Sequence, residues 1–482
     1  MLFNSFSFGL FLPITLLLYW AVGFNRIKAQ NAILLLASYF FYGLWDWRFL
    51  FLIAASSLVD YFAALAIKAT ENNGKQKIYL YSSIIWNLGV LFLFKYYNFF
   101  IDEFALLFNM QQGEYAFSTL NLILPVGLSF YTFQTMSYTI DVYKKRIEPT
   151  KNLLNFLCFV SFFPQLVAGP IEKASDLLPQ FSKQRSFKTE EAKEGLRQIL
   201  WGLFKKMVIA DNAAYIVNMV YASPEDYGSL SLVYASILFF FQIYGDFSGY
   251  SDIAIGTAKL FGFKLSKNFN IPYLAKSVAE YWQRWHISLS TWFRDYLYIP
   301  LGGSKGGNWM RIRNTFTIFI VSGFWHGANW TFIVWGALNA LFIMPSIIMK
   351  TNRNNLEIVA KGKKLPTLKE LLQIKLTFGL TVFAWIFFRA EDIHHAIAYC
   401  TKILSTSLFS LPKFLDMTNA LIILIVTAIF MLIEWIGREQ EFALQTIGLK
   451  WNRCFRYLFY LLITFAIFWF GGKEQRFIYF QF

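Results

Sequence analysis

Two histidines stand out in the stretch Tyr281–Trp330, which is rich in tryptophan. The chain has four histidines in 482 residues, and His286 and His326 are two of them. His326 lies in a charge-free apolar stretch, where an ionisable group is costly and marks a functional site by default. Burial beside Trp325 and Trp330 would keep its imidazole neutral, and a neutral imidazole suits a general base. We expect that role; a packing histidine at a helix break is the simpler alternative.

The block around His286, residues 281–298, repeats apolar and aromatic residues at spacings of three and four. This period predicts one amphipathic helix. Because tryptophan and tyrosine gather at membrane boundaries, we expect the helix to lie along the interface. His286 is then either a functional group or a histidine that hydrogen-bonds a neighbour within an interfacial anchor.

Two carboxylates lie in the apolar segment Phe241–Gly256. Asp246 and Asp252 both need partners at membrane depth. We expect them to orient a histidine or to pair with Arg284 or Arg294. A proton relay in a transporter is the competing interpretation.

The sequence holds no recognisable metal or nucleotide motif. Its three cysteines are scattered, none pairs with a histidine at zinc-ligand spacing, and neither a Walker nor a GxSxG motif occurs. We therefore expect no metal and no permanently bound cofactor.

The composition indicates the scaffold that must hold these residues. Hydrophobic residues make up 56% of the chain and charged residues 15%, against about 25% charged in soluble domains. We expect an all-α polytopic membrane protein of about nine to twelve transmembrane helices, some broken or re-entrant, around a central tunnel. One membrane domain over residues 1–482 is expected, with its core motifs in 125–345.

The chain has a net charge of +15, and its basic residues gather in loops. Basic loops alternate with neutral or acidic ones, which is the positive-inside pattern and does not indicate a nucleic-acid partner. It predicts both chain ends outside an inner-membrane type of bilayer, with Lys144–Arg197 and Lys350–Lys369 in the cytoplasm. Membrane lipids are thus the expected surroundings.

Two apolar stretches break this alternation. Asn152–Ile171 contains FFPQLVAGPI and has basic residues on both sides. Because proline and glycine interrupt helices, we expect a re-entrant or interfacial element there; an ordinary span is the alternative. Asn314–Met349 is also bounded by basic residues at both ends, so a short, broken pair of helices with His326 near the turn is expected.

Four sequence blocks together resemble the membrane-bound O-acyltransferase (MBOAT) family, and most of all its bacterial alginate O-acetyltransferase branch. The blocks are FPQLVAGPI, DFSGYSDIAIG, WQRWHISLSTWFRDYLYIPLGG and FWHGANW, in the expected order. The similarity runs from about Pro125 to the terminal FIYFQF. D-alanyl transferases of teichoic acids share a related WHxSLSxWFRDY block, but the run YIPLGG at Tyr298–Gly303 is closer to the alginate branch.

The resemblance implies an enzyme of the bacterial inner membrane. It would move an acetyl group from a cytoplasmic thioester, with acetyl-CoA as the donor, for O-acetylation of an extracytoplasmic polysaccharide. A periplasmic SGNH-type acetyltransferase and exopolysaccharide machinery are the implied partners. His326 would be the catalytic base and His286 a second catalytic residue. Further candidates for binding substrate, stabilising an oxyanion or orienting groups are Asn329, Trp325, Asp246, Asp252, Arg284, Arg294 and Asp295.

Other functions stay open at this point. A D-alanyl or other acyl transferase of cell-wall polymers would share much of the pattern. Broken helices and buried acids also occur in secondary transporters and proton-coupled channels. A non-enzymatic scaffold for polysaccharide export is a third alternative.

Overall fold

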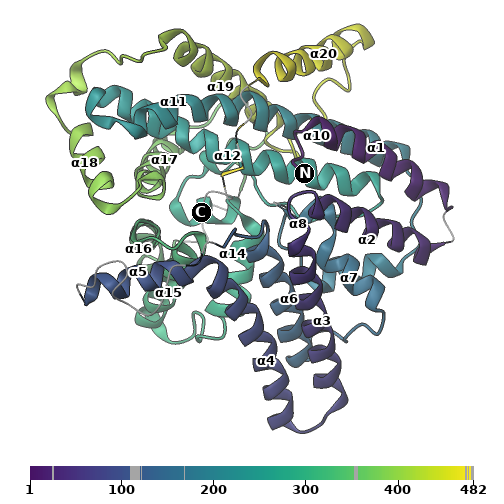
Figure 1. Cartoon of the computed structure of the whole chain (residues 1–482). Helices are drawn as coiled ribbons and strands as arrows, with labels where there is room; N and C mark the ends of the chain where they lie inside the picture. The colour runs from purple at the N-terminus through teal and green to yellow at the C-terminus, as the bar shows by residue number, and fades with distance from the viewer. Residues whose placement is uncertain are drawn as a thin grey trace. The chain divides into compact units, whose positions relative to one another are not determined.

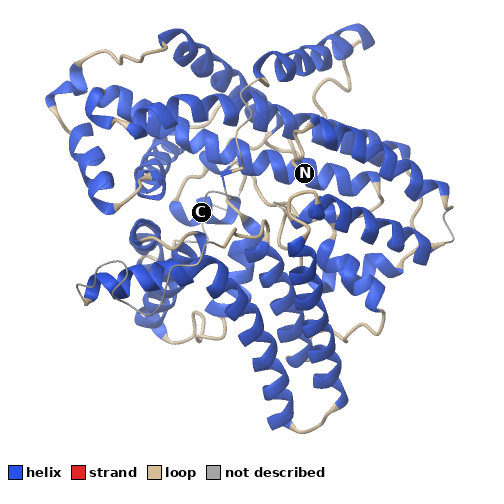
Figure 2. Ribbon diagram, viewed as in Figure 1, coloured by secondary structure: helices blue, strands red, loops and turns tan. Residues whose placement is uncertain are grey.

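The computed structural model describes residues 1–23, 26–108, 120, 122–167, 169–351, 357–472, 475 and 477–478. These residues form helices and loops, and no strand occurs among them (Figure 2). The chain divides into two compact units, one of Met1–Gly195 with Thr257–Ser266 and the other of Leu196–Gly256 with Lys267–Phe482. That the whole chain acts as one membrane domain stays a prediction.

The first unit contains the amino-terminal helices (Figure 1). They are α1 (Phe6–Ala21), α2 (Ile27–Gly43), α3 (Arg48–Ala69), α4 (Asn73–Leu91), the π-helical turn η1 (Phe92–Tyr96), α5 (Tyr97–Leu107), α6 (Leu128–Tyr143), α7 (Leu153–Ser161), α8 (Phe163–Leu166), α9 (Ala174–Leu177) and η2 (Leu178–Ser182). Helices α3, α4 and α6 meet around the buried Asp60, which accepts hydrogen bonds from Ser83 Oγ (2.5 Å), Asn87 Nδ2 (2.9 Å) and Thr139 Oγ1 (3.4 Å). These donors satisfy a carboxylate that is otherwise costly in an apolar bundle.

The second unit contains the rest of the helices. Helices α10 (Thr189–Leu203) and α12 (Ser229–Leu260) contribute residues to both units. The others are η3 (Phe204–Ala210), α11 (Asp211–Ala222), η4 (Pro224–Asp226), η5 (Pro272–Leu274), α13 (Val278–Arg284), α14 (Ile287–Phe293), η6 (Arg294–Tyr298), α15 (Gly307–His326), α16 (Trp330–Ile348), α17 (Leu368–Arg389), α18 (Ile393–Ile403), η7 (Thr406–Phe409), α19 (Met417–Gly437) and α20 (Arg453–Phe470).

Seven helices in the described part of the chain are long and apolar enough to cross a membrane. They are Arg48–Ala69, Asn73–Leu107, Ser229–Leu260, Trp330–Ile348, Leu368–Arg389, Met417–Gly437 and Arg453–Phe470, and the shorter apolar helices Phe6–Ala21 and Leu153–Leu166 accompany them. The chain is therefore an all-α, multi-pass membrane protein, as predicted. The central tunnel stays a prediction.

The two stretches that break the charge alternation are both interrupted helices. Helix α7 is nine residues long and ends at Ser161, and after Phe162 α8 forms a single turn. Nine residues rise about 14 Å, well short of the roughly 30 Å hydrocarbon core, so this segment supports the re-entrant interpretation. In the other stretch, the predicted turn is present, because α15 and α16 form a hairpin joined at residues 327–329, directly after His326. The prediction that this pair is short is wrong: α15 begins at Gly307, before the charge-free stretch, and the two helices have 20 and 19 residues.

Glycines let α15 and α16 pack backbone against backbone. A Cβ atom on Gly323 would lie 2.2 Å from the carbonyl oxygen of Phe332, and one on Gly336 would lie 2.3 Å from that of Phe319. Small residues permit such close crossings of apolar helices. The position of His326, one turn beyond Gly323, is thereby set by contacts between two backbones.

The prediction of one helix over residues 281–298 is wrong. Helix α13 ends at Arg284, α14 begins at Ile287, and the π-helical turn η6 follows it. The break falls at His286, whose backbone is left-handed at φ 42° and ψ 57°. The N–H of Ile287 bonds to the carbonyl oxygen of Asn268 (2.9 Å) and not to a preceding turn of helix. Both short helices keep the aromatic spacing, so the period alone does not reveal the break.

Candidate active site

His326 is the last residue of α15, and its ring is buried among aromatic rings. The residue is 2% exposed. Its ring centroid lies 4.9 Å from that of Trp325, 5.2 Å from Trp335 on α16 and 5.4 Å from Phe388 on α17. Trp330, the first residue of α16, was expected to be buried here but is 50% exposed. The surroundings of His326 are thus apolar on three sides, which strengthens electrostatic interactions there.

His286 also lies near Trp325, with 6.3 Å between the centroids of its ring and that of Trp325. The His286 ring contacts Phe247 of α12 at 4.6 Å and lies nearly parallel to Phe269 at 6.4 Å. The histidine is 1% exposed, and burial lowers the pKa of His286 to about 3. It is therefore neutral at physiological pH. The structure brings the two sequence-predicted histidines to one place, where both rings lie near the indole of Trp325.

Asn329 holds the turn that follows His326. Its side-chain oxygen accepts from the N–H of Thr331 (3.0 Å) and so caps α16, and its amide nitrogen donates to the carbonyl oxygen of Glu391 (2.8 Å). Asparagine is among the preferred residues at a helix N-cap. The oxygen and the nitrogen of this amide therefore both make structural hydrogen bonds, three residues after His326.

The carboxylates of α12 pair with two lysines of η3. Asp246 lies 2.8 Å from Lys206 Nζ, which also contacts Asp211 at 2.7 Å, and Asp252 lies 2.6 Å from Lys205 Nζ. These lysines take the place of the histidine or arginine that the sequence suggested. Lys205 and Lys206 lie in an apolar segment of the sequence. Buried lysines need acidic partners there, so they could have been predicted to pair with the two aspartates.

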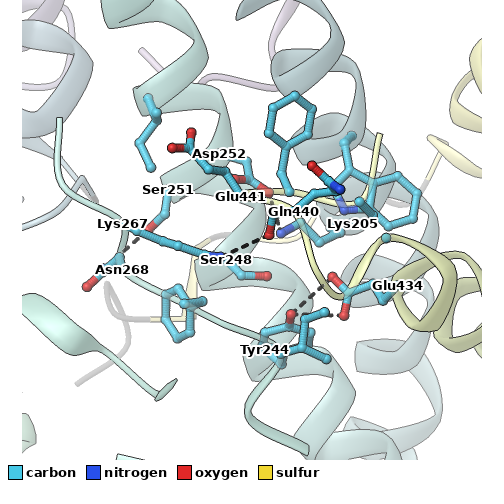
Figure 3. Close-up of a pocket in the computed structure, with 17 residues that line it drawn as sticks. Lys205, Tyr244, Ser248, Ser251, Asp252, Lys267, Asn268, Glu434, Gln440 and Glu441 are labelled. Atoms are coloured by element: carbon cyan, nitrogen blue, oxygen red, sulfur yellow. Dashed lines mark hydrogen bonds and ion pairs between the residues drawn. The ribbon is translucent and has the colours of Figure 1, made fainter. Parts of the chain in front are cut away.

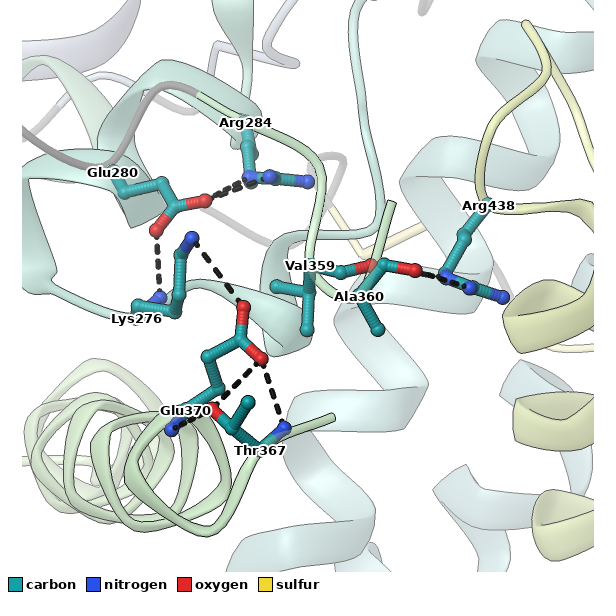
Figure 4. Close-up of polar contacts among 8 residues, drawn as sticks. All are labelled: Lys276, Glu280, Arg284, Val359, Ala360, Thr367, Glu370 and Arg438. Atoms are coloured by element: carbon teal, nitrogen blue, oxygen red, sulfur yellow. Dashed lines mark hydrogen bonds and ion pairs between the residues drawn. The ribbon is translucent and has the colours of Figure 1, made fainter. Parts of the chain in front are cut away.

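Arg284 belongs to a network that holds α13 (Figure 4). Its guanidinium donates to Glu280 Oε1 (2.7 Å), one turn earlier on the same helix. The other carboxylate oxygen of Glu280 accepts from the N–H of Lys276 (2.7 Å), and Lys276 Nζ lies 3.9 Å from Glu370 at the start of α17. This arrangement fixes the helix that leads into His286.

Arg294 and Asp295 form a pair of sequence neighbours in η6. Arg294 Nε lies 2.8 Å from Asp295 Oδ1, and the arginine side chain is 58% exposed. Exposed pairs of this kind contribute about 0–1 kcal/mol. Neither residue is among the ring contacts given above for His326 and His286. A role of this pair in catalysis stays a prediction.

A polar pocket lies next to His286 in the second unit (Figure 3). Phe269 lines it and also packs near the His286 ring. On its other side, Glu434 of α19 accepts from the hydroxyl groups of Tyr244 (3.0 Å) and Tyr273 (2.9 Å). The polar lining comprises Lys205, Tyr244, Ser248, Ser251, Asp252, Lys267, Asn268, Glu434, Gln440 and Glu441.

Of the polar residues of this pocket, only Asp252 was a predicted site residue. Glu434 is an acid within an apolar span, which by itself marks a candidate functional residue. Lys205 carried the same signal, but Lys267 and Gln440 lie in ordinary polar loops and nothing local distinguished them. No group of histidine, cysteine, aspartate and glutamate residues suited to a metal ion occurs in the part of the chain that the structure describes.

A buried pair of histidines in a multi-pass helical membrane protein defines the class of site, and comparisons with known proteins identify the family. Residues 149–374 match the membrane-bound O-acyltransferase family, MBOAT. The chain is 35% identical to the probable alginate O-acetylase AlgI of Pseudomonas putida, with 99% of each chain covered. It is 36% identical to the peptidoglycan O-acetyltransferase of Helicobacter pylori, covering 82% of this chain and 78% of that one.

This protein belongs to the membrane-bound O-acyltransferase family. It is also 27% identical to the teichoic acid D-alanyltransferase of Bacillus subtilis, over 82% of this chain and 99% of that one. The predicted family is confirmed, and the protein is an O-acyltransferase. The transporter and scaffold alternatives are left without support.

Proposed function

We propose that this enzyme takes an acetyl group from a cytoplasmic thioester, with acetyl-CoA as the donor, for O-acetylation of a polysaccharide outside the membrane. The observation that carries the proposal is the burial of His326 at the end of α15, between aromatic rings and close to a second buried histidine. The relatives named as alginate O-acetylase and peptidoglycan O-acetyltransferase support acetyl as the group and a saccharide polymer as its destination.

In the proposed reaction His326 acts as general base. Its neutral imidazole accepts the proton of an acceptor hydroxyl while the hydroxyl oxygen attacks the thioester carbonyl carbon. The tetrahedral intermediate collapses with cleavage of the C–S bond, and the proton on His326 passes to the departing thiolate. His286, whose ring also lies near Trp325, orients the reacting groups or donates a hydrogen bond to the oxyanion.

The basic loop before α17 supports a cytoplasmic, anionic donor. Arg438, just after α19, donates to the carbonyl oxygens of Val359 (3.0 Å) and Ala360 (2.9 Å) and so fixes this loop (Figure 4). The loop exposes Lys361, Lys363 and Lys364, a cluster that attracts anionic ligands such as a nucleotide. Gly437 and Gln440, which flank this arginine closely in sequence, line the polar pocket. We therefore place the donor at this end of the second unit.

The acceptor is proposed to face the opposite side. The immediate acceptor would be a hydroxyl group on an SGNH-type periplasmic transferase or on the polysaccharide itself, so that exopolysaccharide machinery acts with this enzyme in the inner membrane. The D-alanyl alternative rests on the more distant relative and is an outcome of the following test.

The test supplies labelled donor to membrane vesicles of defined orientation that contain the full-length protein. With acetyl-labelled acetyl-CoA on the cytoplasmic face, label is expected in the polymer or in a periplasmic acceptor protein, and the His326→Ala variant is expected to transfer none. Vesicles of the opposite orientation serve as the control. Failure of the wild-type protein to transfer acetyl, with transfer of D-alanine from a charged carrier in its place, would reject the proposal in favour of the alternative.

Topology is predicted to place Lys361 in the cytoplasm and Leu411, which is 83% exposed, outside. We expect a cysteine at Leu411 to react with an impermeant maleimide in intact cells and one at Lys361 to react only after permeabilisation. Cys454 is exposed and is first replaced by serine. Equal labelling of both sites in intact cells would contradict the predicted orientation. Glu114, the natural site for a third probe, lies outside the described residues.

A further inference from the structure

Asn268 caps the short helix α14 from outside that helix. This residue lies in the loop between α12 and η5 and is 0% exposed. Its carbonyl oxygen accepts from the N–H of Ile287 (2.9 Å), and its Oδ1 accepts from Ser288 Oγ (2.9 Å) and from the N–H of Ser288 (3.3 Å). The first N–H groups of a helix have no partner within it. His286, at the N-cap, makes no side-chain capping bond, so Asn268 supplies the cap.

The same segment also holds the chain before His286. The N–H of Asn270 donates to the carbonyl oxygen of Arg284 (2.9 Å), and Arg284 Nη1 donates to the carbonyl oxygen of Asn270 (3.1 Å). Together with the Asn268 contacts, these bonds bracket Trp285 and His286 on both sides. A left-handed backbone at a residue other than glycine persists only where its surroundings impose it. Here the contacts of segment 268–270 impose the left-handed backbone conformation of His286.

This backbone conformation decides where the imidazole lies. A side chain at an N-cap usually turns back to the first turn of its own helix. Because Asn268 caps α14 instead, the His286 ring packs against Phe247 (4.6 Å) and reaches Trp325 (6.3 Å). Misplacing a reacting group by about 1 Å can cost on the order of 100-fold in rate.

We propose that Asn268 is a positioning residue of this acyltransferase, which fixes the backbone and hence the ring of His286 by capping α14. The inference rests on the proposed role of His286 in acyl transfer. Asn268 also donates from Nδ2 to Ser251 Oγ (3.3 Å), which ties the cap to α12. The side-chain contacts to Ser288 use the acceptor oxygen, so an aspartate at position 268 retains them and an alanine does not.

The experiment counts acetyl groups on the exported polymer in cells that carry equal amounts of folded full-length protein. Asn268→Ala is expected to lower transfer about 10-fold or more, and Asn268→Asp to recover it to within about threefold of wild type, because aspartate caps helices as well as asparagine does. Asn212→Ala is the matched control. Asn212 is also a buried asparagine of the second unit, and its amide bonds to the carbonyl oxygens of Met207 and Val208; transfer is expected within about twofold of wild type.

Folded protein is measured by size-exclusion and thermal unfolding in detergent. Equal impairment of folded Asn268→Asp and Asn268→Ala would overturn the inference, as would near-normal transfer by Asn268→Ala. If the alanine variant does not fold, Ser288→Ala removes the shorter of the two contacts, the hydroxyl bond to Asn268 Oδ1, and leaves the N–H bond in place. Unchanged transfer by that variant together with no recovery by Asn268→Asp overturns the inference. His286→Ala is measured in parallel: full transfer by it rejects the proposed function of His286, whereas impaired His286→Ala with normal Asn268→Ala rejects the positioning role alone.

Discussion

Replacing His326 with alanine is expected to abolish acyl transfer while the protein still folds. The substitution removes the proposed general base, and loss of such a base lowers rates by about 10²–10⁴-fold. The ring is enclosed by Trp325, Trp335 and Phe388, so water does not easily replace the imidazole. Transfer is measured as acetyl groups on the exported polymer for equal amounts of folded protein.

Two further histidine variants make this result specific. His286→Ala is expected to impair transfer less than His326→Ala, because the role proposed for His286 is to orient groups or to stabilise the oxyanion. His394→Ala is expected to have little effect, since His394 is exposed on α18. If the His394 variant were as damaging as the His326 variant, the assigned place of the active site would be wrong, and full activity of His326→Ala would remove the general-base assignment.

Replacing Lys206 with alanine is expected to destabilise the second unit severely. Lys206 Nζ lies 2.7 Å from Asp211 and 2.8 Å from Asp246, and all three side chains are at most 4% exposed. Removing one partner of a buried ion pair leaves uncompensated charge and typically costs about 3–5 kcal/mol. We expect a large loss of folded protein and a lower temperature of unfolding in detergent.

Two comparisons separate charge from bulk in this prediction. Lys193→Ala breaks the exposed pair with Glu190, whose side chains are 58% and 84% exposed, and should change stability by no more than about 0.5 kcal/mol. Adding Asp211→Asn and Asp246→Asn to Lys206→Ala neutralises the stranded carboxylates and should recover part of the loss. A Lys206→Ala protein as stable as wild type would contradict this account.

Much of the fold follows from local sequence. The apolar window at residues 50–67 predicts α3, observed as Arg48–Ala69, because a span of about 20 apolar residues has few structures available in a bilayer. The break after His326 was also predictable from the adjacent glycine and asparagine. The break at His286 was not, because it depends on Asn268, which lies 18 residues earlier and makes its contacts only in the folded chain.

The candidate site was also predictable only where local sequence determines it. Both histidines were identified from their apolar surroundings, and the structure brings both rings close to Trp325. Asp246 and Asp252 were expected to orient a histidine or to pair with Arg284 or Arg294, but their partners are lysines on η3. Which cation reaches a buried carboxylate depends on how α12 and η3 pack, and no spacing within either segment encodes that.

The enclosure of His326 also bears on how the enzyme is made. Phe388, one of the rings around it, is 62 positions further along the chain than the histidine and near the end of α17. During synthesis, both histidine motifs therefore emerge from the ribosome well before the last wall of the site. A nascent chain that stops after Ile348 carries both histidine motifs, yet the apolar enclosure of His326 still lacks one side. Under the role proposed for His326, catalytic competence is acquired late in biogenesis, when α17 has inserted.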